Sequence, residues 1–294
     1  MRSQQVSFSQ LMTYIRCPEH WLFRYRLGIR RQPRKVFKRG FALHETLQYH
    51  FEEKKKDGKG ISLPEAKEFF VASFKNAMED YQQELAEARP FLTREYLSKE
   101  KQVNVPDMVD ASLKGLEVYF KQLNPYIKPD LIEQAFEFGV EPGLTVGGRI
   151  DLTDKSGVIH ELKTSKVTPN KQDIRADAQI AIYQIGYQTI TGKAPKGISK
   201  DYIVVSKTNP RIVRFKVVHP FINKQSVLRN ILNIMNAINN NVFYCLHPAE
   251  SWICSKEWCP YYREHQQLKK LGFEAFMAKY APRYSSRKLA RQRR

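Results

Sequence analysis

The segment 146–166, with the sequence VGGRIDLTDKSGVIHELKTSK, constrains the fold of this chain more than any other part. Its pattern of apolar residues predicts strands over residues 144–153 and 157–164. Between them, Asp, Lys, Ser and Gly at 154–157 have the composition of a tight turn. The two strands are therefore expected to pair antiparallel across that turn.

Antiparallel pairing would bring two carboxylates, Asp151 and Glu161, close together. Residues i and i+2 of a strand share a face, so Glu161 and Lys163 point the same way. The backbone carbonyl of Leu162 lies between them as a third oxygen for Mg²⁺ or Mn²⁺, which take one or two carboxylates from a protein. Water on such an ion becomes a nucleophile, and Lys163 would orient it or stabilise transition-state charge. The set predicts metal-dependent cleavage of phosphodiesters.

A lone match of this kind more often means an exposed hairpin with an ordinary ion pair between Glu161 and Lys163. A second motif opposes that interpretation. The helix expected over 173–190 carries Gln179 and Tyr183, which i, i+4 spacing places on one helical face. Taken alone, these two side chains could also merely pack within a half-buried helix.

With two further motifs, the chain resembles the RecB-like branch of the PD-(D/E)xK nuclease superfamily. Gln179 and Tyr183 match its Q-x-x-x-Y motif, His44 in RGFALHETLQ matches its Gly-x-x-x-His, and Cys17 begins a Cys-Pro like the one that opens these domains. The branch includes helicase-linked recombination nucleases, CRISPR-associated adaptation nucleases and many phage exonucleases, and the resemblance covers residues 7–265. It implies that His44 is an additional metal ligand, and that Gln179 and Tyr183 orient Lys163 or the DNA backbone.

The cysteines depart from the pattern of these relatives, many of which hold a 4Fe-4S cluster on one early and three late cysteines. Here His265 stands where the relatives have their last cysteine, and the chain's thiols are Cys17, Cys245, Cys254 and Cys259. His265 is then a ligand, or Cys245 substitutes, or aromatic packing replaces the cluster. The aromatic candidates are Trp252, Trp258, Tyr261 and Tyr262. An iron–sulfur cluster, a zinc ion and a metal-free core all stay open.

The charge balance favours a nucleic-acid substrate. Lys and Arg number 49 against 30 acidic residues, a formal net charge of +19, and such an excess promotes phosphate contact through counterion release. A solvated basic surface is the alternative. The expected DNA-contacting residues are Lys166, Arg175, Arg287, Lys288 and Arg291. The last three lie in a basic tail, 284–294, which is expected to be flexible.

The motifs argue for one α/β domain over residues 1–283, because His44 precedes a helical region and Asp151 follows it. The resemblance implies a restriction-endonuclease-like core, a central mixed sheet flanked by helices with an N-terminal helical region. The expected parts are a helical part at about 7–125, a sheet core at about 131–240 and a cysteine-containing segment at 241–283. Helices are expected over 7–24, 37–54, 64–89, 107–123, 173–190 and 220–240, strands over 131–140, 144–153, 157–164, 202–206 and 211–218, and loops over 54–60 and 99–106.

The resulting hypothesis is a Mg²⁺- or Mn²⁺-dependent DNA nuclease, an exonuclease in recombination, repair or phage DNA metabolism, with a 4Fe-4S cluster as an open second cofactor. The alternatives are a structure-specific or CRISPR-type endonuclease and a non-catalytic DNA-binding or assembly subunit. A helicase, recombinase or other DNA-processing protein is an expected partner, since no phosphate-loop motif occurs. Residues 1–8 are too polar for a secretory signal and no stretch approaches a membrane span, so the cytoplasm of a microbe or phage-infected cell is expected.

Overall fold

The computed structural model of the chain describes residues 4–29, 33–89, 92–168, 178–217, 224–245 and 254–280. Its contacts divide the chain into two compact units, each assembled from separated segments. The first unit comprises Met1–Phe8, Lys35–Asp80 and Asn104–Asn230, and the second comprises Ser9–Arg34, Tyr81–Val103 and Ile231–Arg294. None of the described helices has both the length and the apolarity that crossing a membrane requires.

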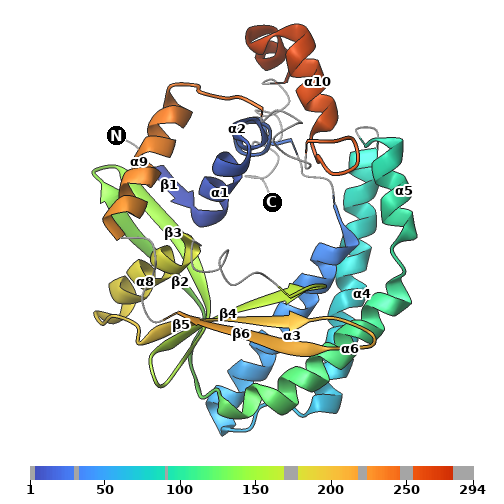
Figure 1. Ribbon diagram of the computed structural model, residues 1–294, viewed down its shortest axis with the longest axis vertical. Helices are drawn as coiled ribbons and strands as arrows, with labels where there is room; N and C mark the ends of the chain where they lie inside the picture. Colours follow the sequence, from blue (N-terminus) through green and yellow to red (C-terminus); the bar gives the residue numbers. More distant parts are fainter. Residues whose placement is uncertain are drawn as a thin grey trace, which may run out of the picture. The chain divides into compact units, whose positions relative to one another are not determined.

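A mixed sheet organises the first unit, where the described residues contribute six strands (Figure 1). The strands are β1 Gln4–Ser7, β2 Pro129–Glu141, β3 Leu144–Asp154, β4 Val158–Ser165, β5 Gly197–Val204 and β6 Arg211–Val217. Their order is β1-β3-β4-β5-β6, with β2 also paired to β3. The β1–β3 and β4–β5 pairs are parallel, and the others are antiparallel. The expected fold class, a mixed sheet flanked by helices, is confirmed.

Strand β3 pairs with three other strands, β1, β2 and β4. Strand β2 pairs with β3 along its whole length. Both β1 and β4 must therefore lie along the other edge, where β1 pairs with residues 144–147 and β4 pairs with Leu152 and Thr153. The part of β3 between these two contacts, residues 148–151, contains Asp151.

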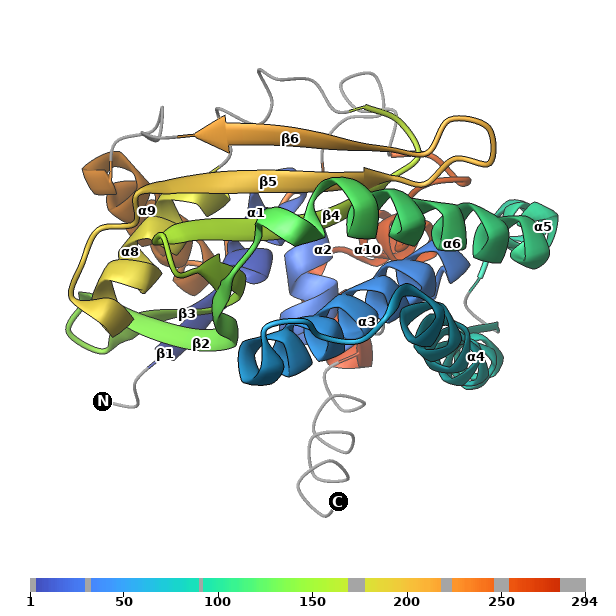
Figure 2. The ribbon, with the colours of Figure 1, turned by 90° about the horizontal axis from the view of Figure 1, so that it is seen from below.

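Helices cover the sheet. The long helix α3, Lys35–Asp57, packs against β2 and β4, and α6, Val105–Gln122, runs along β5 and β6 (Figure 2). Gly115 lets α6 approach β5 closely, because a Cβ at this position would lie 2.9 Å from Ile203 Cγ2. Helix α8, Ala178–Thr191, lies beside β2 and β3 (Figure 1). Gly186 permits this packing, because a Cβ there would lie 2.5 Å from atoms of the Phe136 ring.

The expected helices over 37–54, 64–89 and 107–123 are confirmed as α3, α4 (Leu63–Ala88) and α6. The start of α4 is a capping box, with Ser62 N–H donating to Glu65 Oε2 at 2.7 Å and Glu65 N–H donating to Ser62 Oγ at 3.4 Å. The loop expected over 54–60 begins too early in the prediction, because α3 continues to Asp57. Gly58 follows the helix and terminates it with a φ of +81°.

The expected loop over 99–106 is wrong in its first half, where α5 spans Arg94–Gln102. This helix is polar, but Thr93 caps its start by accepting from Tyr96 N–H, and Tyr96 is buried. The single helix expected over 7–24 is also wrong. The chain forms β1, then α1 (Phe8–Arg16), α2 (Pro18–Trp21) and the π-helical turn η1 (Leu22–Arg26). The break falls at Cys17, which is extended because Pro18 follows it.

Two other described elements precede α10. A 3-10 turn, η3, spans Asn124–Tyr126, and α9 spans Lys224–Asn239 within the helix expected over 220–240. Helix α10, Tyr262–Leu271, was not expected. In the second unit it joins a small core with η1, formed by Leu22, Phe23, Leu27, Cys259, Tyr261, Leu268 and Phe276.

Candidate active site

Strands β3 and β4 separate where the sequence predicts the site. Their register consists of two pairs next to the turn, Leu152 with His160 and Thr153 with Ile159. Farther along, the Leu162 N–H donates at 3.0 Å to Asp151 Oδ2. A side-chain carboxylate thus occupies the opening between the strands. The sequence predicts that Asp151 lies close to Glu161, and here Asp151 contacts Leu162, the residue that follows Glu161.

The predicted carbonyl ligand, Leu162, faces the same opening. The N–H and C=O of one strand residue point to the same side, and the Leu162 N–H points to Asp151. Burial lowers the pKa of His44, and a hydrogen bond with the Leu162 backbone only partly opposes that shift. The Leu162 backbone thus lies near both Asp151 and His44.

Glu161, the residue before Leu162, is a buried carboxylate. Its residue is only 1% exposed, Oε1 accepts from Gln179 Nε2 at 2.8 Å, and Oε1 also pairs with Lys163 Nζ. Among the described residues, Oε2 is buried with no hydrogen-bond partner. A buried carboxylate oxygen without a partner is costly, and a hard divalent cation would satisfy it. The residues here thus fit the divalent ion that the sequence predicts.

Helix α8 supports Glu161 through the two residues of the predicted helical motif. The Gln179 amide donates to Glu161 Oε1 and, at 2.9 Å, to Tyr183 Oη. Burial raises the pKa of Tyr183, and the neighbouring Glu161 and Asp151 charges raise it further, so its hydroxyl stays protonated. The motif had suggested an orienting role toward Lys163 or DNA, whereas its observed contact is with Glu161.

A residue missed in the sequence, Glu133, groups with two of the predicted ligands, His44 and Asp151. One donor atom each from His44, Glu133 and Asp151 lies within 4.8 Å of the other two. Glu133 has φ +45° in β2, between residues that pair with Leu152 and Ile150, so it lies opposite Asp151. The signal in the sequence was register: counting back from the Pro142–Gly143 turn places Glu133 near Asp151.

Crowding of carboxylates shifts the acidity of the site. Burial raises the pKa of Asp151 well above its usual range, the Glu161 charge raises it further, and Lys163 opposes both. Burial also raises the pKa of Glu133. For His44, burial and the Lys163 charge lower the pKa, which favours a neutral imidazole. A divalent cation would displace protons from such carboxyl groups and accept the neutral imidazole as a ligand.

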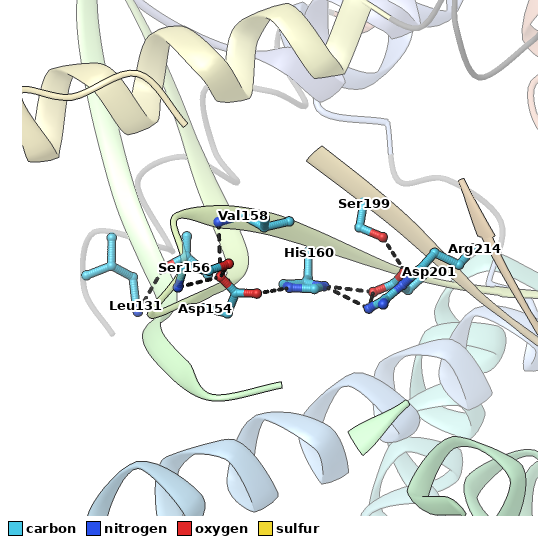
Figure 3. A network of polar contacts seen from close by, with 9 residues as sticks. Leu131, Asp154, Ser156, Val158, His160, Ser199, Asp201 and Arg214 are labelled. Carbon is cyan, nitrogen blue, oxygen red and sulfur yellow. Dashed lines mark hydrogen bonds and ion pairs between the residues drawn. The ribbon is translucent and has the colours of Figure 1, made fainter. Parts of the chain in front are cut away.

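Behind Glu161, a buried network fixes β4 to its neighbours (Figure 3). His160 Nδ1 lies 2.9 Å from Asp201 Oδ2, and Nε2 lies 3.1 Å from Asp154 Oδ2. Arg214 Nε donates to Asp201 Oδ1 at 2.8 Å. His160 and Glu161 are consecutive, so they point to opposite faces of the sheet. The network therefore anchors the strand that carries Glu161 and Lys163.

This network explains an error in the predicted strand over 202–206. Strand β5 begins at Gly197, and its residues Ser199, Lys200 and Asp201 are buried. Ser199 Oγ donates to Asp201 Oδ1 at 2.6 Å, so the polar side chains have partners inside the protein. Without those partners, the same polar residues are typical of a loop.

The predicted DNA-contacting residues are only partly described. Lys166 is exposed just beyond the end of β4. Arg175, Arg287, Lys288 and Arg291 lie outside the described residues, as does Trp252.

The predicted sulfur ligands gather in the second unit. Cys17 and Cys259 are buried, Cys245 and Cys254 are partly buried, and no disulfide joins any of these four described cysteines. Interactions with Cys245, Cys259 and Glu19 raise the pKa of His265 to about 11, although burial alone would lower it. His20, which the sequence did not suggest, lies 3.4 Å from Cys259 through Nε2. The alternative was that aromatic packing replaces the cluster. Of its candidates, Tyr261 is buried, whereas Trp258 is exposed.

Comparison with known proteins identifies a family over most of the chain. The family model described as the PD-(D/E)XK nuclease superfamily matches residues 5–263. A crystal structure of a candidate exonuclease from Eubacterium rectale is 15% identical, with a TM-score of 0.36, and covers 67% of this chain and 76% of that one. The crystal structure of SSO0001 is also 15% identical, with a TM-score of 0.31, and covers 56% and 78%. No curated protein is significantly similar.

Proposed function

Because the chain belongs to the PD-(D/E)XK nuclease superfamily, we propose that it hydrolyses DNA phosphodiester bonds with a bound divalent metal ion. We assign it as an exonuclease acting in recombination, repair or phage DNA metabolism in the cytoplasm. One observation carries the catalytic part of this proposal. Among the described residues, Glu161 Oε2 is buried without a hydrogen-bond partner, and Glu161 precedes Leu162, whose N–H donates to Asp151.

Five groups would hold Mg²⁺ or Mn²⁺: the carboxylates of Asp151, Glu161 and Glu133, the imidazole of His44 and the carbonyl of Leu162. The oxygen-rich set suits a hard cation, and the imidazole favours Mn²⁺ over Mg²⁺. When bound, such an ion acidifies water and neutralises charge on the phosphate. Asp151 is held by the Leu162 N–H, and Glu161 is held by Gln179. These contacts keep both carboxylates in place before the substrate arrives.

Lys163 is the catalytic cation. Its side chain is 39% exposed, so it reaches solvent while Nζ stays paired with buried Glu161. A fixed ammonium there orients the attacking water and stabilises the added charge on the phosphate in the transition state. Because Lys163 and Glu161 share a face of β4, one strand positions both the metal ligand and the charge.

DNA as the substrate is supported by charge. The formal net charge of +19 favours binding along a phosphate backbone. Exposed Lys166 lies three residues beyond Lys163, so it would contact a phosphate next to the scissile bond. Arg175 and the tail residues Arg287, Lys288 and Arg291 would add further contacts. A partner such as a helicase or recombinase would supply any unwinding.

Digestion of matched linear and circular DNA tests the proposal. End-labelled linear duplex, linear single strand and closed circles are incubated with Mg²⁺ or Mn²⁺, using wild type, Glu161→Gln and Glu141→Gln. Glu141 is an exposed carboxylate of β2, so its variant is the matched control. If the protein is an exonuclease, the wild type degrades linear DNA and leaves circles intact. The Glu161→Gln variant should degrade neither. Cutting of circles would make the enzyme an endonuclease, and intact DNA under every condition would contradict catalysis.

A further inference from the structure

Two histidines and two buried cysteines of the second unit come together from the two ends of the chain. Cys17 precedes α2, and His20 lies within that helix. Cys259 precedes α10, and His265 lies in its first turns. The rings of His20 and His265 have centroids 5.2 Å apart. The four side chains therefore converge although more than 200 residues separate the two pairs.

Three of these side chains have donor atoms close enough to share an ion, and the fourth, Cys259, contacts one of the three. One donor atom each from Cys17, His20 and His265 lies within 4.8 Å of the other two, and His20 Nε2 lies 3.4 Å from Cys259 Sγ. Zinc bonds of about 2.0–2.3 Å in a tetrahedron place ligand atoms about 3.3–3.8 Å apart. Small side-chain movements would bring these atoms to that spacing.

His265 points to a missing ligand most directly. The residue is 4% exposed, its Nδ1 lies 2.5 Å from Glu19 Oε2, and its buried Nε2 has no hydrogen-bond partner among the described residues. In metal sites, a ligating histidine commonly donates its other ring N–H to a carboxylate, which fixes the ring and its tautomer. Glu19 does this for His265 and leaves Nε2 available to an ion.

The donor chemistry of this group suits zinc better than a four-iron cluster. Such a cluster is ordinarily held by four cysteine thiolates. The group here combines two imidazoles with two thiolates, a set that is common in structural zinc sites.

We propose that Cys17, His20, Cys259 and His265 bind one structural zinc ion, with Glu19 as the carboxylate that orients His265. The choice of ligands follows from proximity, because Cys17, His20 and His265 form one group and Cys259 contacts His20. Cys245 groups with Glu19 and His265 instead, and both Cys245 and Cys254 remain outside the proposed ligand set. The ion would link α2 to α10 within the second unit. The proposed nuclease metal ligands and Lys163 belong to the first unit, so this site is a different one.

Metal content of the full-length purified protein tests this proposal independently of nuclease activity. We expect colourless protein with one zinc per chain by mass spectrometry. Replacement by Co²⁺ should give the visible absorption of a tetrahedral ion and a thiolate charge-transfer band. His20→Ala should lose the zinc, and Glu19→Gln should weaken zinc affinity by about 10–100-fold. The matched controls Cys245→Ser and Cys254→Ser should keep it.

Three outcomes would overturn the proposal. Brown protein with about four irons per chain, retained in His20→Ala, would show a cluster instead. Zinc retained at full stoichiometry in His20→Ala would remove His20 from the ligand set. Metal-free protein that takes up no added Zn²⁺ would show a metal-free core. If His20→Ala does not fold, as judged by circular dichroism, the zinc affinity of Glu19→Gln decides, because that change preserves the side-chain shape.

Discussion

The carboxylate of Asp151 accepts the backbone N–H of Leu162 at 3.0 Å, so one proposed metal ligand is held by the strand that carries another. The hydrogen bond replaces a rung of the β3–β4 ladder. Where the strands separate, the Leu162 N–H has no partner on the β3 backbone, and the Asp151 carboxylate satisfies it instead. Accurate placement of Asp151 and Glu161 thus depends on the backbone of β4 rather than on flexible side chains.

Removing the catalytic charge should abolish turnover but spare binding. Lys163→Met should lower the cleavage rate by at least about 10²–10³-fold, because it removes charge stabilisation in the transition state. Its DNA affinity should stay near that of wild type. Single-turnover cleavage and fluorescence anisotropy measure the two effects. Lys166→Ala is the control and should weaken binding with little effect on the saturated rate; a wild-type rate in Lys163→Met would remove Lys163 from catalysis.

Glu133 should act through the metal. Glu133→Gln keeps the size of the side chain but removes a charged ligand, so we expect a higher Mn²⁺ concentration for half-maximal cleavage, by about tenfold or more. High Mn²⁺ should restore much of the rate. Titration of activity and calorimetric Mn²⁺ binding measure this, with Glu141→Gln as the matched control. Identical metal dependence in both variants would make Glu133 a structural residue.

Gln179 should contribute as a positioning residue for Glu161. Gln179→Ala should lower metal affinity or activity by about 10–100-fold, the usual effect of losing a group that orients a ligand. Tyr183→Phe should have a smaller effect, because it retains the ring that packs against Phe136. Gln188→Ala, on an exposed part of α8, is the control. A loss of thermal stability with unchanged metal affinity would indicate packing alone.

The His160–Asp201 pair should make stability depend on pH. Despite burial, hydrogen bonds to Asp154 and Asp201 raise the pKa of His160 above its usual 6.5, so its contribution is complete below pH 6.5 and is lost as pH rises through the raised value. Although burial opposes it, His160 and Arg214 lower the pKa of Asp201 below 3.8, so that contribution is lost as pH falls through the lowered value. The network is therefore most stabilising between about pH 4 and pH 6.5.

Asp201→Asn should test this window, because it removes the charge shared by His160 and Arg214. Breaking a buried ion pair costs about 3–5 kcal/mol of unfolding free energy. We expect the difference from wild type to be largest near pH 5–6 and to shrink at higher pH, as measured by urea unfolding. Asp110→Asn, at an exposed position of α6, is the control. A pH-independent difference would show that charge is not the cause.

The basic tail should set salt dependence. Residues 287–294 contain five cationic side chains and no acidic one, and they lie outside the described residues. Truncation after Ser286 should flatten the slope of log affinity against log salt by roughly 0.7–0.9 for each phosphate that the tail neutralises in the full-length protein. Filter binding at several salt concentrations measures the slope. An unchanged affinity and slope would show that the tail does not bind DNA.

Local sequence determined the parts of this protein that depend on short-range spacing. The hairpin that carries Asp151, Glu161 and Lys163 depends on alternation and on one turn, and both lie within 23 residues. Gln179 and Tyr183 share a face because they are one helical turn apart. The Gln179 amide can therefore donate both to Tyr183 and to Glu161. The capping box of α4 is likewise a three-residue relationship. In each case, the interacting groups are neighbours in the chain, so the spacing in the sequence specifies the contact.

Tertiary structure decided whatever depends on segments that are distant in sequence. Glu133 joins Asp151 only through the register of β2, which a single bulge can shift. His20 meets Cys259 and His265 only after the two ends of the chain pack together. Strand β5 is buried with charged residues because Asp201 finds His160 and Arg214 on other strands. A polar residue looks exposed in sequence until its partner is known, because burial of a charge is stable only when a distant group neutralises it.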